Sequence, residues 1–456
     1  MSGQTHAPNP ARIITFSFFL AILAGTLLLS LPFSTALGRI RLSDALFTAT
    51  SAVCVTGLSV VDIGTTFTRF GQIVIMILIQ LGGLGIMTFS AFFLSLLGRR
   101  ASITDRFAFR MITEKFASVN LFRALLAILS VTLVLEGLGA AFLFLRFQEM
   151  FPFPKALYYS IFHAISAFCN AGFSLFPESL IGFQEEFLVP AVMMTLIFLG
   201  GLGFFVLTDA VEKIGNFILR RKSFRVSLHA KIVLTTTVFL ILSGTVIIWL
   251  LERGNLLSSL PLPLQIWNAL FQSITPRTAG FNTLQISSLS DATLFFIGIL
   301  MFIGGAPAST AGGIKVTTFG IFLAMVWCQA RGREGTSLFK RKVPQQVIAR
   351  SLAILVASFA LINLMTFLLA ISEHQGLPPV LASSRFLSLF FEVLSAFGTV
   401  GLSMGLTPTL TLTGKLLIIF TMFVGRLGPL TLALAVAARR PSEVHFEYAE
   451  EEVIVG

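Results

Sequence analysis

The chain consists of long apolar runs separated by short polar segments. A helix needs about 20 mostly apolar residues to cross the hydrocarbon core of a bilayer. The first run is too long for a secretory signal and lacks a small-residue cleavage site, so we expect it to be retained as a span. The pattern predicts eight membrane spans, at residues 13–33, 71–97, 124–145, 187–208, 232–251, 292–327, 351–371 and 416–438.

A shorter apolar segment lies between the two spans of each successive pair. Each of these segments is too short to cross a bilayer and is followed by a glycine-containing stretch. Irregular backbone at membrane depth is tolerated only where it is buried in protein or lines water. We therefore expect an aqueous path formed by four re-entrant segments, at residues 44–59, 158–174, 265–282 and 386–403.

The four re-entrant segments are copies of one another. They align without gaps as FTATSAVCVTGLS, FHAISAFCNAGFS, LFQSITPRTAGFN and FEVLSAFGTVGLS, and the following spans repeat as LGGLGIM, LGGLGFF, IGGAPAS and VGRLGPL. A lone loop glycine is usually a turn, and GGLG within a helix usually marks close helix packing. Four copies in register favour a repeated pore element instead. The glycines in register are Gly57, Gly172, Gly280 and Gly401, each followed two places later by Ser59, Ser174, Asn282 or Ser403.

The repeats predict an all-α polytopic membrane protein with four pseudo-symmetric helix–pore-loop–helix repeats around a central pore. Backbone carbonyls of the four loops can replace the hydration shell of a cation, and each short helix would aim its partly negative C-terminal end at the centre. The glycine allows backbone conformations that a Cβ forbids. The predicted divisions are an N-terminus at 1–11, repeats at 12–98, 99–213, 214–328 and 329–438, and a tail at 439–456.

Composition excludes an ordinary soluble enzyme. The 456 residues are 55% hydrophobic and 12% charged, whereas soluble proteins carry about 25% charged residues. The net charge of +11 does not indicate nucleic-acid binding, because the basic residues lie in short loops between spans. Six Lys or Arg lie in each of the loops 99–123, 213–231 and 331–350, which predicts that these loops and both termini are cytoplasmic. Three cysteines without a CxxC pair indicate no redox or zinc site.

The sixth run is interrupted by GGAPASTAGGIK at residues 304–315. Its glycines, proline and small hydroxylated residues cannot hold a regular helix. We expect a loop beneath the filter, and a kink packed against its neighbours is the alternative. Arg426 lies within the eighth run, where a charge costs about 2.5–3.5 kcal/mol on insertion scales. We expect it to face a cavity below the filter, and a buried bond to Glu136 or to a helix carboxyl end is the alternative.

Other polar residues near the filters have two interpretations each. The acids Asp44, Asp62, Glu178 and Glu392 either concentrate cations at the outer mouth or are simply solvated, with Glu392 least easily explained because it lies within a pore helix. We expect Arg277 to brace the third filter from behind, and His163 to be structural. Cys54 and Cys169 occupy equivalent repeat positions and are expected to pack behind the filter.

The motifs SAVCVTGL, FCNAGF, TPRTAGFNT, FGTVGLS and STAGGIK resemble those of the Trk/Ktr/HKT superfamily of potassium transporters. The chain is most similar to its bacterial eight-span Ktr-type membrane subunit. The resemblance implies potassium uptake in the bacterial cytoplasmic (inner) membrane, coupled to or stimulated by sodium. It also implies a homodimer, to which the tail EYAEEEVIVG contributes, and a cytosolic nucleotide-binding regulatory ring. No cofactor is expected in this chain itself.

The resemblance also assigns roles to residues. The potassium filter would consist of Val55, Thr56, Gly57 and Leu58; Asn170, Ala171, Gly172 and Phe173; Thr278, Ala279, Gly280 and Phe281; and Thr399, Val400, Gly401 and Leu402. The intramembrane gate would consist of Gly304, Gly305, Ser309, Thr310, Ala311, Gly312, Gly313, Lys315 and Arg426. Each filter has one glycine where potassium channels have two, so we expect looser discrimination among monovalent cations.

Four alternative functions differ from this interpretation. A sodium-permeable or mixed monovalent cation transporter would have the same architecture. A membrane enzyme would need convergent acid, base or nucleophile groups, and no P-loop or catalytic motif occurs in the sequence. A transporter with alternating access would show inverted repeats, whereas all four repeats here enter from one face. A purely structural or sensor subunit would transport no ion.

Overall fold

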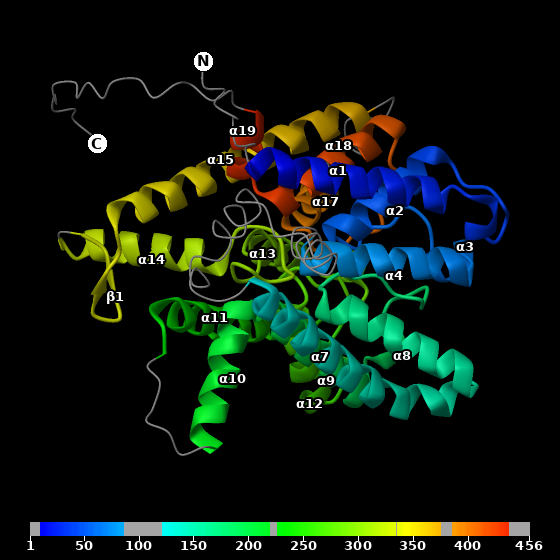
Figure 1. Ribbon diagram of the computed structural model, residues 1–456, viewed down its shortest axis with the longest axis horizontal. Coiled ribbons are helices and arrows are strands. Elements are labelled where there is room, and N and C mark those ends of the chain that lie inside the picture. Colours follow the sequence, from blue (N-terminus) through cyan, green and yellow to red (C-terminus); the bar gives the residue numbers. More distant parts are fainter. Residues whose placement is uncertain (1–9, 86–120, 219–225, 334, 375–384, 437–456) are drawn as a thin grey trace.

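The computed structural model describes residues 10–85, 121–218, 226–333, 335–374 and 385–436. Within these ranges the chain is mostly helical, and its two strands, β1 (Ser337–Leu338) and β2 (Arg341–Lys342), form a short hairpin. Both termini, the C-terminal tail, most of the loop 99–123 and residues 86–97 of the second predicted span lie outside the described residues. Figure 1 shows helices packed into one bundle, from which α14 and the hairpin extend to one side.

Each of the four repeats contains an outer helix, a short pore helix and a second helix. The outer helices are α1 (Pro10–Leu29), α7 (Leu121–Met150), α11 (Leu228–Glu252) and α15 (Gln345–Glu373). The pore helices are α2 (Leu42–Cys54), α8 (Phe153–Phe168), α12 (Leu262–Ile274) and α17 (Phe386–Gly398). The second helices begin with α4 (Arg69–Leu84), α9 (Leu188–Leu202), α13 (Asp291–Phe302) and α18 (Leu412–Leu427). Single turns connect them: η1 (Pro32–Ser34), α3 (Ile63–Thr66), η3 (Ile181–Phe183), η4 (Ile286–Ser288) and η5 (Thr407–Thr409).

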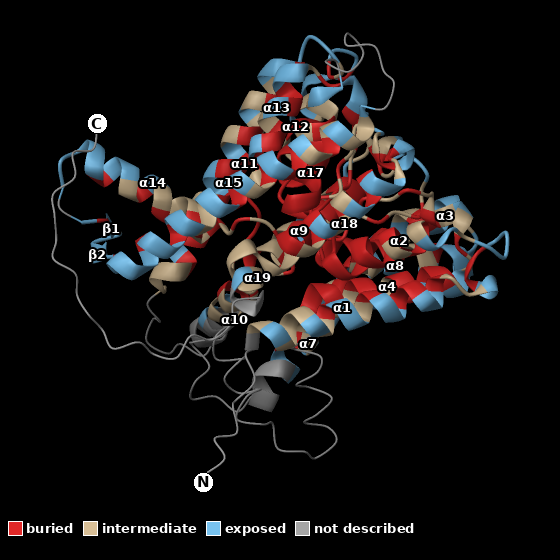
Figure 2. Cartoon of the chain, turned by 90° about the horizontal axis from the view of Figure 1, so that it is seen from above, coloured by how far each residue is buried: buried red, intermediate tan, exposed pale blue. Residues whose placement is uncertain are grey.

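The repeats close into a ring in chain order. The second helix of each repeat packs against the pore helix of the next: α4 on α8, α9 on α12, α13 on α17, and α18 back on α2. Figure 2 shows the buried residues concentrated in the pore and second helices, with exposed residues on the helices around them. The pore helices are therefore packed into the ring, with exposed side chains toward their N-terminal ends, such as Leu42, Phe153 and Leu262.

The four outer helices contribute much of the exposed apolar surface. Among the described residues, α1, α7, α11 and α15 contain the unbroken helices that are long and apolar enough to cross a membrane. Their large apolar side chains point outward, as with Phe19, Phe142, Phe239 and Phe359, which are 50–65% exposed. Contiguous exposed apolar surface of this extent is unfavourable in water and favourable in hydrocarbon. The chain is a membrane protein.

The second helices differ from the sequence-based expectation. Only the sixth span was expected to be broken, but α9 and α18 are also interrupted at the matching level of the repeat, where α4 ends. α9 meets α10 (Phe204–Ile218) at Gly203 with a bend of 102°, α18 meets α19 (Pro429–Val436) at Gly428, and α4 ends at Gly85. These three glycines have φ of 83–84°, which a residue with a Cβ adopts only at a cost. The interpretation of the fourth and eighth runs as continuous spans was wrong.

Candidate ion filter and gate

The filter backbone alternates between left-handed and ordinary conformations in every repeat. The residue two places before each glycine has positive φ, namely 56° at Val55, 59° at Asn170, 81° at Thr278 and 50° at Thr399. Each glycine itself has φ between 71° and 96°. Non-glycine residues rarely adopt this conformation, and β-branched ones least of all. The sequence pattern indicated the glycines but gave no sign of strain at the positions before them.

The four glycines face one another in a ring. A Cβ placed on Gly57 would lie 2.5 Å from the carbonyl oxygen of Ala171, and one on Gly172 would lie 3.0 Å from that of Ala279. In the same way Gly280 abuts the carbonyl oxygen of Val400, and Gly401 that of Thr56. The residue before each glycine thus presents its carbonyl oxygen to the glycine of the preceding repeat. Four loops from distant parts of the chain meet at one axis, with peptide oxygens among their closest neighbours.

Hydroxyl-bearing residues at the ends of the pore helices hold the filter backbone. The amides of Thr56, Ala171 and Val400 donate to the carbonyl oxygens of Ser51, Ser166 and Ser395, at 2.7–2.8 Å. The Ser51 and Ser395 hydroxyls also accept from the amides of Gly57 and Gly401, at 3.0 and 3.1 Å. Because these amides bond to the pore helices behind the filter, their carbonyls are available to the axis.

In the third repeat, the hydroxyl that makes the equivalent bond lies one residue closer to its glycine. The Thr275 hydroxyl donates to the carbonyl oxygen of Phe281 at 2.5 Å, as that of Ser166 does to Phe173 at 2.8 Å. Thr275 lies five places before its glycine, whereas the three serines lie six places before theirs. These hydroxyls were not among the site residues predicted from the sequence. The Ser-Ala pair recurring in register in three of the four segments was the available signal.

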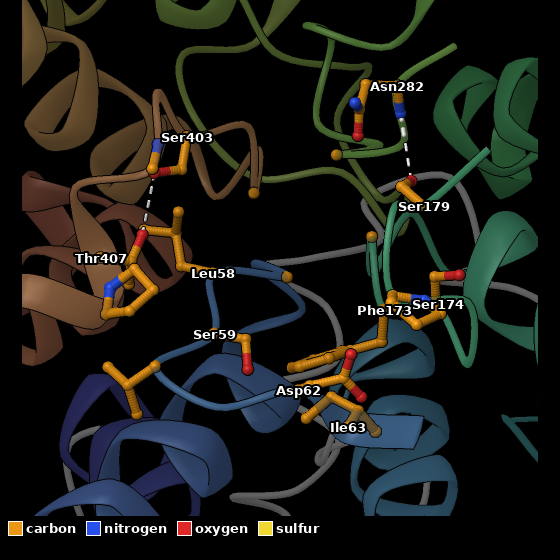
Figure 3. A pocket seen from close by; sticks show the side chains of 18 of the residues that line it. Leu58, Ser59, Asp62, Ile63, Phe173, Ser174, Ser179, Asn282, Ser403 and Thr407 are labelled. Atoms are coloured by element: carbon orange, nitrogen blue, oxygen red, sulfur yellow. Dashed lines mark hydrogen bonds between the residues drawn. The ribbon is translucent and has the colours of Figure 1, made fainter. Parts of the chain in front are cut away.

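A cavity of about 480 Å³ lies on the glycine side of the filter and is lined by residues from all four repeats. Its polar lining includes Ser59, Ser174, Asn282 and Ser403, the small polar residues two places after each glycine. Figure 3 shows these side chains around the cavity, with Asp62 among them. The side chains at the fourth filter position, Leu58, Phe173, Phe281 and Leu402, are buried. We refer to this cavity as the vestibule.

The candidate acids occupy four different environments. Asp62 lines the vestibule, and its carboxylate accepts from the Thr65 amide at 2.8 Å. Glu178 is exposed. Asp44 is paired with Lys415 of α18 at 2.8 Å and is mostly buried. Glu392 is fully buried behind the filter of the fourth repeat. Of the charged residues in the described part of the chain, Asp62 alone lines the vestibule.

The interruption of the sixth run is an ordered loop packed against the filter. Ile303 pairs with Ile314 at its base, and Val316 begins α14 (Val316–Ala330). On one side the loop is bound to the broken helix of repeat 2: the amides of Ala306 and Thr310 donate to Gly201 and Gly200, at 2.9 and 3.3 Å. We refer to residues 303–315, which include most of the gate residues predicted from the sequence, as the gating loop.

The gating loop contacts the first filter position of two repeats. The Asn170 amide donates to the Thr310 hydroxyl at 2.8 Å, and that hydroxyl donates to the carbonyl oxygen of Phe168 at 3.1 Å. Gly312 lies so close to the Thr399 side chain that a Cβ there would collide with it. The loop therefore lies against the filter on the side away from the vestibule. The predicted gate residues Gly304, Gly305, Ser309, Ala311 and Gly313 all belong to it.

Arg426 tethers the gating loop to repeat 1. Its guanidinium donates to the carbonyl oxygens of Thr310 and of Gly82, the latter in the last turn of α4. The partly negative C-terminal end of a helix favours a cation. This geometry corresponds to the helix-end alternative for Arg426, and Glu136 is instead bound by the Gln80 amide at 3.1 Å. Lys315 remains within its own loop, donating to the Ala311 carbonyl oxygen at 2.7 Å.

The remaining candidates lie behind the filters. Cys54 and Cys169 are fully buried, and a Cβ at Gly83 would come within 2.7 Å of the Cys169 sulfur. Arg277, expected to brace the third filter, donates to the Thr237 hydroxyl of α11 at 3.2 Å. His163 contacts the carbonyl oxygen of Tyr159 at 2.7 Å, and the described residues include no cluster of three side chains that could hold a metal ion.

The chain is similar to cation transport proteins over nearly its whole length. The family model described as TrkH, a cation transport protein, matches residues 4–448. Ktr system potassium uptake protein B from Bacillus subtilis is 40% identical, over 98% of this chain and 97% of that protein. The protein of the same name from Vibrio alginolyticus is also 40% identical, over 98% and 94%.

Two further comparisons extend the similarity. The potassium/sodium uptake protein NtpJ of Enterococcus hirae is 36% identical, over 98% of this chain and 97% of that protein. The crystal structure of the potassium transporter TrkH from Vibrio parahaemolyticus superposes with a TM-score of 0.73, covering 96% of this chain and 87% of that chain at 18% identity. The structural likeness confirms the all-α fold. The family match and these relatives, all named as transport or uptake proteins, show that the chain is a member of the TrkH cation transport protein family.

Proposed function

We propose that the chain conducts potassium ions across the membrane through the axis of the four filter loops. The observation that supports this most directly is the ring in which each filter glycine abuts a carbonyl oxygen of the next repeat. Closely spaced peptide oxygens can replace the hydration shell of a monovalent cation. The potassium uptake named for the relatives agrees with this chemistry.

The gating loop regulates passage in this proposal. An ion leaving the filter meets residues 303–315, so the loop must move for ions to pass. Three sets of bonds resist that movement: those to Gly200 and Gly201, that to Asn170, and that from Arg426. Arg426 also connects the loop to α4, so a displacement of α4 would pull on the loop.

We also propose partner subunits and a membrane topology for the chain. The relatives are named as parts of a Ktr system, which supports a partner subunit. We infer a homodimer in the bacterial cytoplasmic membrane, both termini cytoplasmic, with a cytosolic nucleotide-binding ring docked on the basic loops. Nucleotide would bind that ring, and potassium, with sodium as co-ion or activator, would be the transported ion.

A mixed potassium and sodium pathway is the second candidate. Each filter has a single glycine in its strained segment, so fewer stacked carbonyl rings are available than in a filter with two. One relative is named a potassium/sodium uptake protein. The same axis would serve both ions, with weaker preference between them.

Ion competition tests both candidates. The purified full-length protein is reconstituted into vesicles, and rubidium uptake is measured with potassium, sodium or ammonium as competitor. Potassium transport predicts that potassium competes far better than sodium, whereas the mixed pathway predicts similar competition by both. Absence of rubidium uptake, with the protein verified as folded and inserted, would contradict both.

A further inference from the structure

A buried carboxyl group stands behind the vestibule in the fourth repeat. Glu392 lies in the middle of α17 and is fully buried. In the described part of the chain, the hydrogen bonds of the Glu392 carboxyl group are to hydroxyl groups, and the ion pairs involve other acids. An intramembrane acid is costly and calls for a functional explanation.

The two oxygens of Glu392 hold two residues of the vestibule wall. The Ser403 hydroxyl donates to Oε2 at 2.8 Å, and the Thr407 hydroxyl donates to Oε1. The hydroxyls of Ser403 and Thr407 also lie 3.0 Å apart, and the Ser403 hydroxyl accepts from the Gly405 amide at 3.1 Å. Figure 3 shows Ser403 and Thr407 at the cavity. The carboxyl group thus fixes the segment that follows Gly401.

One face of α17 holds both ends of the fourth filter. Glu392 and Ser395 are three residues apart, so they lie on the same side of the helix. Ser395 binds the amides of Val400 and Gly401 at the inner end, and Glu392 binds the segment beyond the glycine at the outer end. The strained Thr399–Gly401 backbone lies between these two attachments.

The equivalent position in the other repeats supports a brace. Glu392 is nine residues before its glycine, and the matching residues are Thr48, His163 and Phe271. His163 contacts the Ser174 hydroxyl at 3.1 Å, so repeat 2 uses the same bond to the residue two places after its glycine. The Thr48 hydroxyl makes no hydrogen bond in the described structure, and Phe271 cannot make one. Repeats 2 and 4, on opposite sides of the ring, therefore each have a brace. Among the four equivalent positions, only the Glu392 carboxyl group accepts from two hydroxyls with its two oxygens.

We propose that Glu392 is a positioning residue for ion selectivity, acting through its hydrogen bonds to Ser403 and Thr407. The inference rests on the proposed function, because it assigns to this brace the geometry of the fourth filter above Gly401. Loss of the brace lets that segment shift, which alters the spacing of oxygens around a dehydrated ion. Apparent affinity and potassium preference then change more than the maximal rate.

The test compares five proteins in the vesicle assay: wild type, Glu392→Met, Glu392→Gln, Ser403→Ala, and the double variant Glu392→Met with Ser403→Ala. Methionine has similar volume and no acceptor, whereas glutamine can accept from one hydroxyl and donate to the other. We expect Glu392→Met to raise the KM for rubidium about tenfold, the equivalent of one hydrogen bond. Sodium should compete more strongly, with a smaller change in maximal rate. Glutamine should restore most of the wild-type KM.

The double variant tests whether Glu392 acts through its bond to Ser403. If the two residues act through one bond, the KM of the double variant equals that of Glu392→Met. Multiplicative effects of the single variants, or equal damage by Gln and Met, would overturn the inference. Should Glu392→Met fail to fold, Thr407→Val and Ser403→Ala carry the same prediction with milder changes. Glu149→Gln, at an exposed acid paired with Arg146, is the matched control.

The two proposals fail in different ways. A wild-type protein without rubidium uptake contradicts potassium conduction itself. A wild-type protein that transports rubidium, with Glu392→Met unchanged in KM and in competition by sodium, contradicts the role of Glu392 alone.

Discussion

At the scale of single residues, the filter depends on backbone conformations that most side chains disfavour. Val55, Asn170, Thr278 and Thr399 all adopt positive φ, at a cost of about 1–2 kcal/mol each for residues with a Cβ. The serines and threonine at the pore-helix ends supply bonds that stabilise this geometry. The strain persists because the surrounding packing holds it, which is typical of functional sites.

Gly57→Ala should weaken the preference for potassium over sodium about tenfold, since the left-handed conformation becomes costly by about 1–2 kcal/mol. The added Cβ would also lie 2.5 Å from the Ala171 carbonyl oxygen. Competition of sodium against rubidium uptake measures the change. Gly182→Ala is the control, because a Cβ at Gly182 meets nothing within 4 Å. Equal selectivity in the two variants would contradict the filter assignment.

At the scale of elements, the described parts of the second helices end or break beside the filter. The glycines preceding the breaks are required for close packing: a Cβ at Gly82, Gly200 or Gly425 would collide with the carbonyl oxygen of Val53, Phe168 or Phe397. Each of those carbonyls lies four residues before a filter glycine. The GG and VG motifs therefore serve close helix contact, and the glycines three residues later, Gly85, Gly203 and Gly428, serve the break.

Arg426→Gln should increase the rate of rubidium uptake about tenfold. Glutamine is too short to keep both bonds, and a hydrogen bond from a charged donor contributes about 1.5–3 kcal/mol to the closed position of the gating loop. Initial rates in vesicles at equal protein incorporation measure the effect.

Arg253→Gln serves as the control for loss of one positive charge, since Arg253 lies exposed at the end of α11 beside the Trp249 ring. A rate for Arg426→Gln at or below that of wild type would argue against the tether.

At the scale of the whole molecule, the ring requires the last repeat to join the first. α18 packs on α2, and Lys415 pairs with Asp44 across 371 residues of sequence. Both side chains are nearly buried, at 11% and 12% exposure. Breaking a buried pair by removing one partner is more costly than replacing both, because the remaining charge is left uncompensated.

Lys415→Met should destabilise the protein by about 3 kcal/mol, because Asp44 is then left without its cation. Replacing both residues, as Lys415→Met with Asp44→Asn, should recover most of the loss. Thermal unfolding in detergent measures the stability of each variant. If the double variant is no more stable than the single one, the pair is not what joins repeats 1 and 4.

The sequence by itself determined the features that depend on local pattern. Run length and apolar content specified helices in a membrane, and the register of Gly57, Gly172, Gly280 and Gly401 specified four like repeats. These are properties of neighbouring residues, so they can be recognised without knowing which distant segments meet. The family motifs extended the predicted filter to single positions.

Only the tertiary structure decided which partners the buried polar groups have. Arg426 bonds to residues 116 and 344 positions away, and Glu392 lies behind the vestibule wall because its helix turns that side inward. The breaks at Gly203 and Gly428 were likewise visible only in the structure. Contacts between distant segments follow no periodicity along the chain. The residues that predicted a pore therefore could not indicate which bonds hold the gating loop and the vestibule wall.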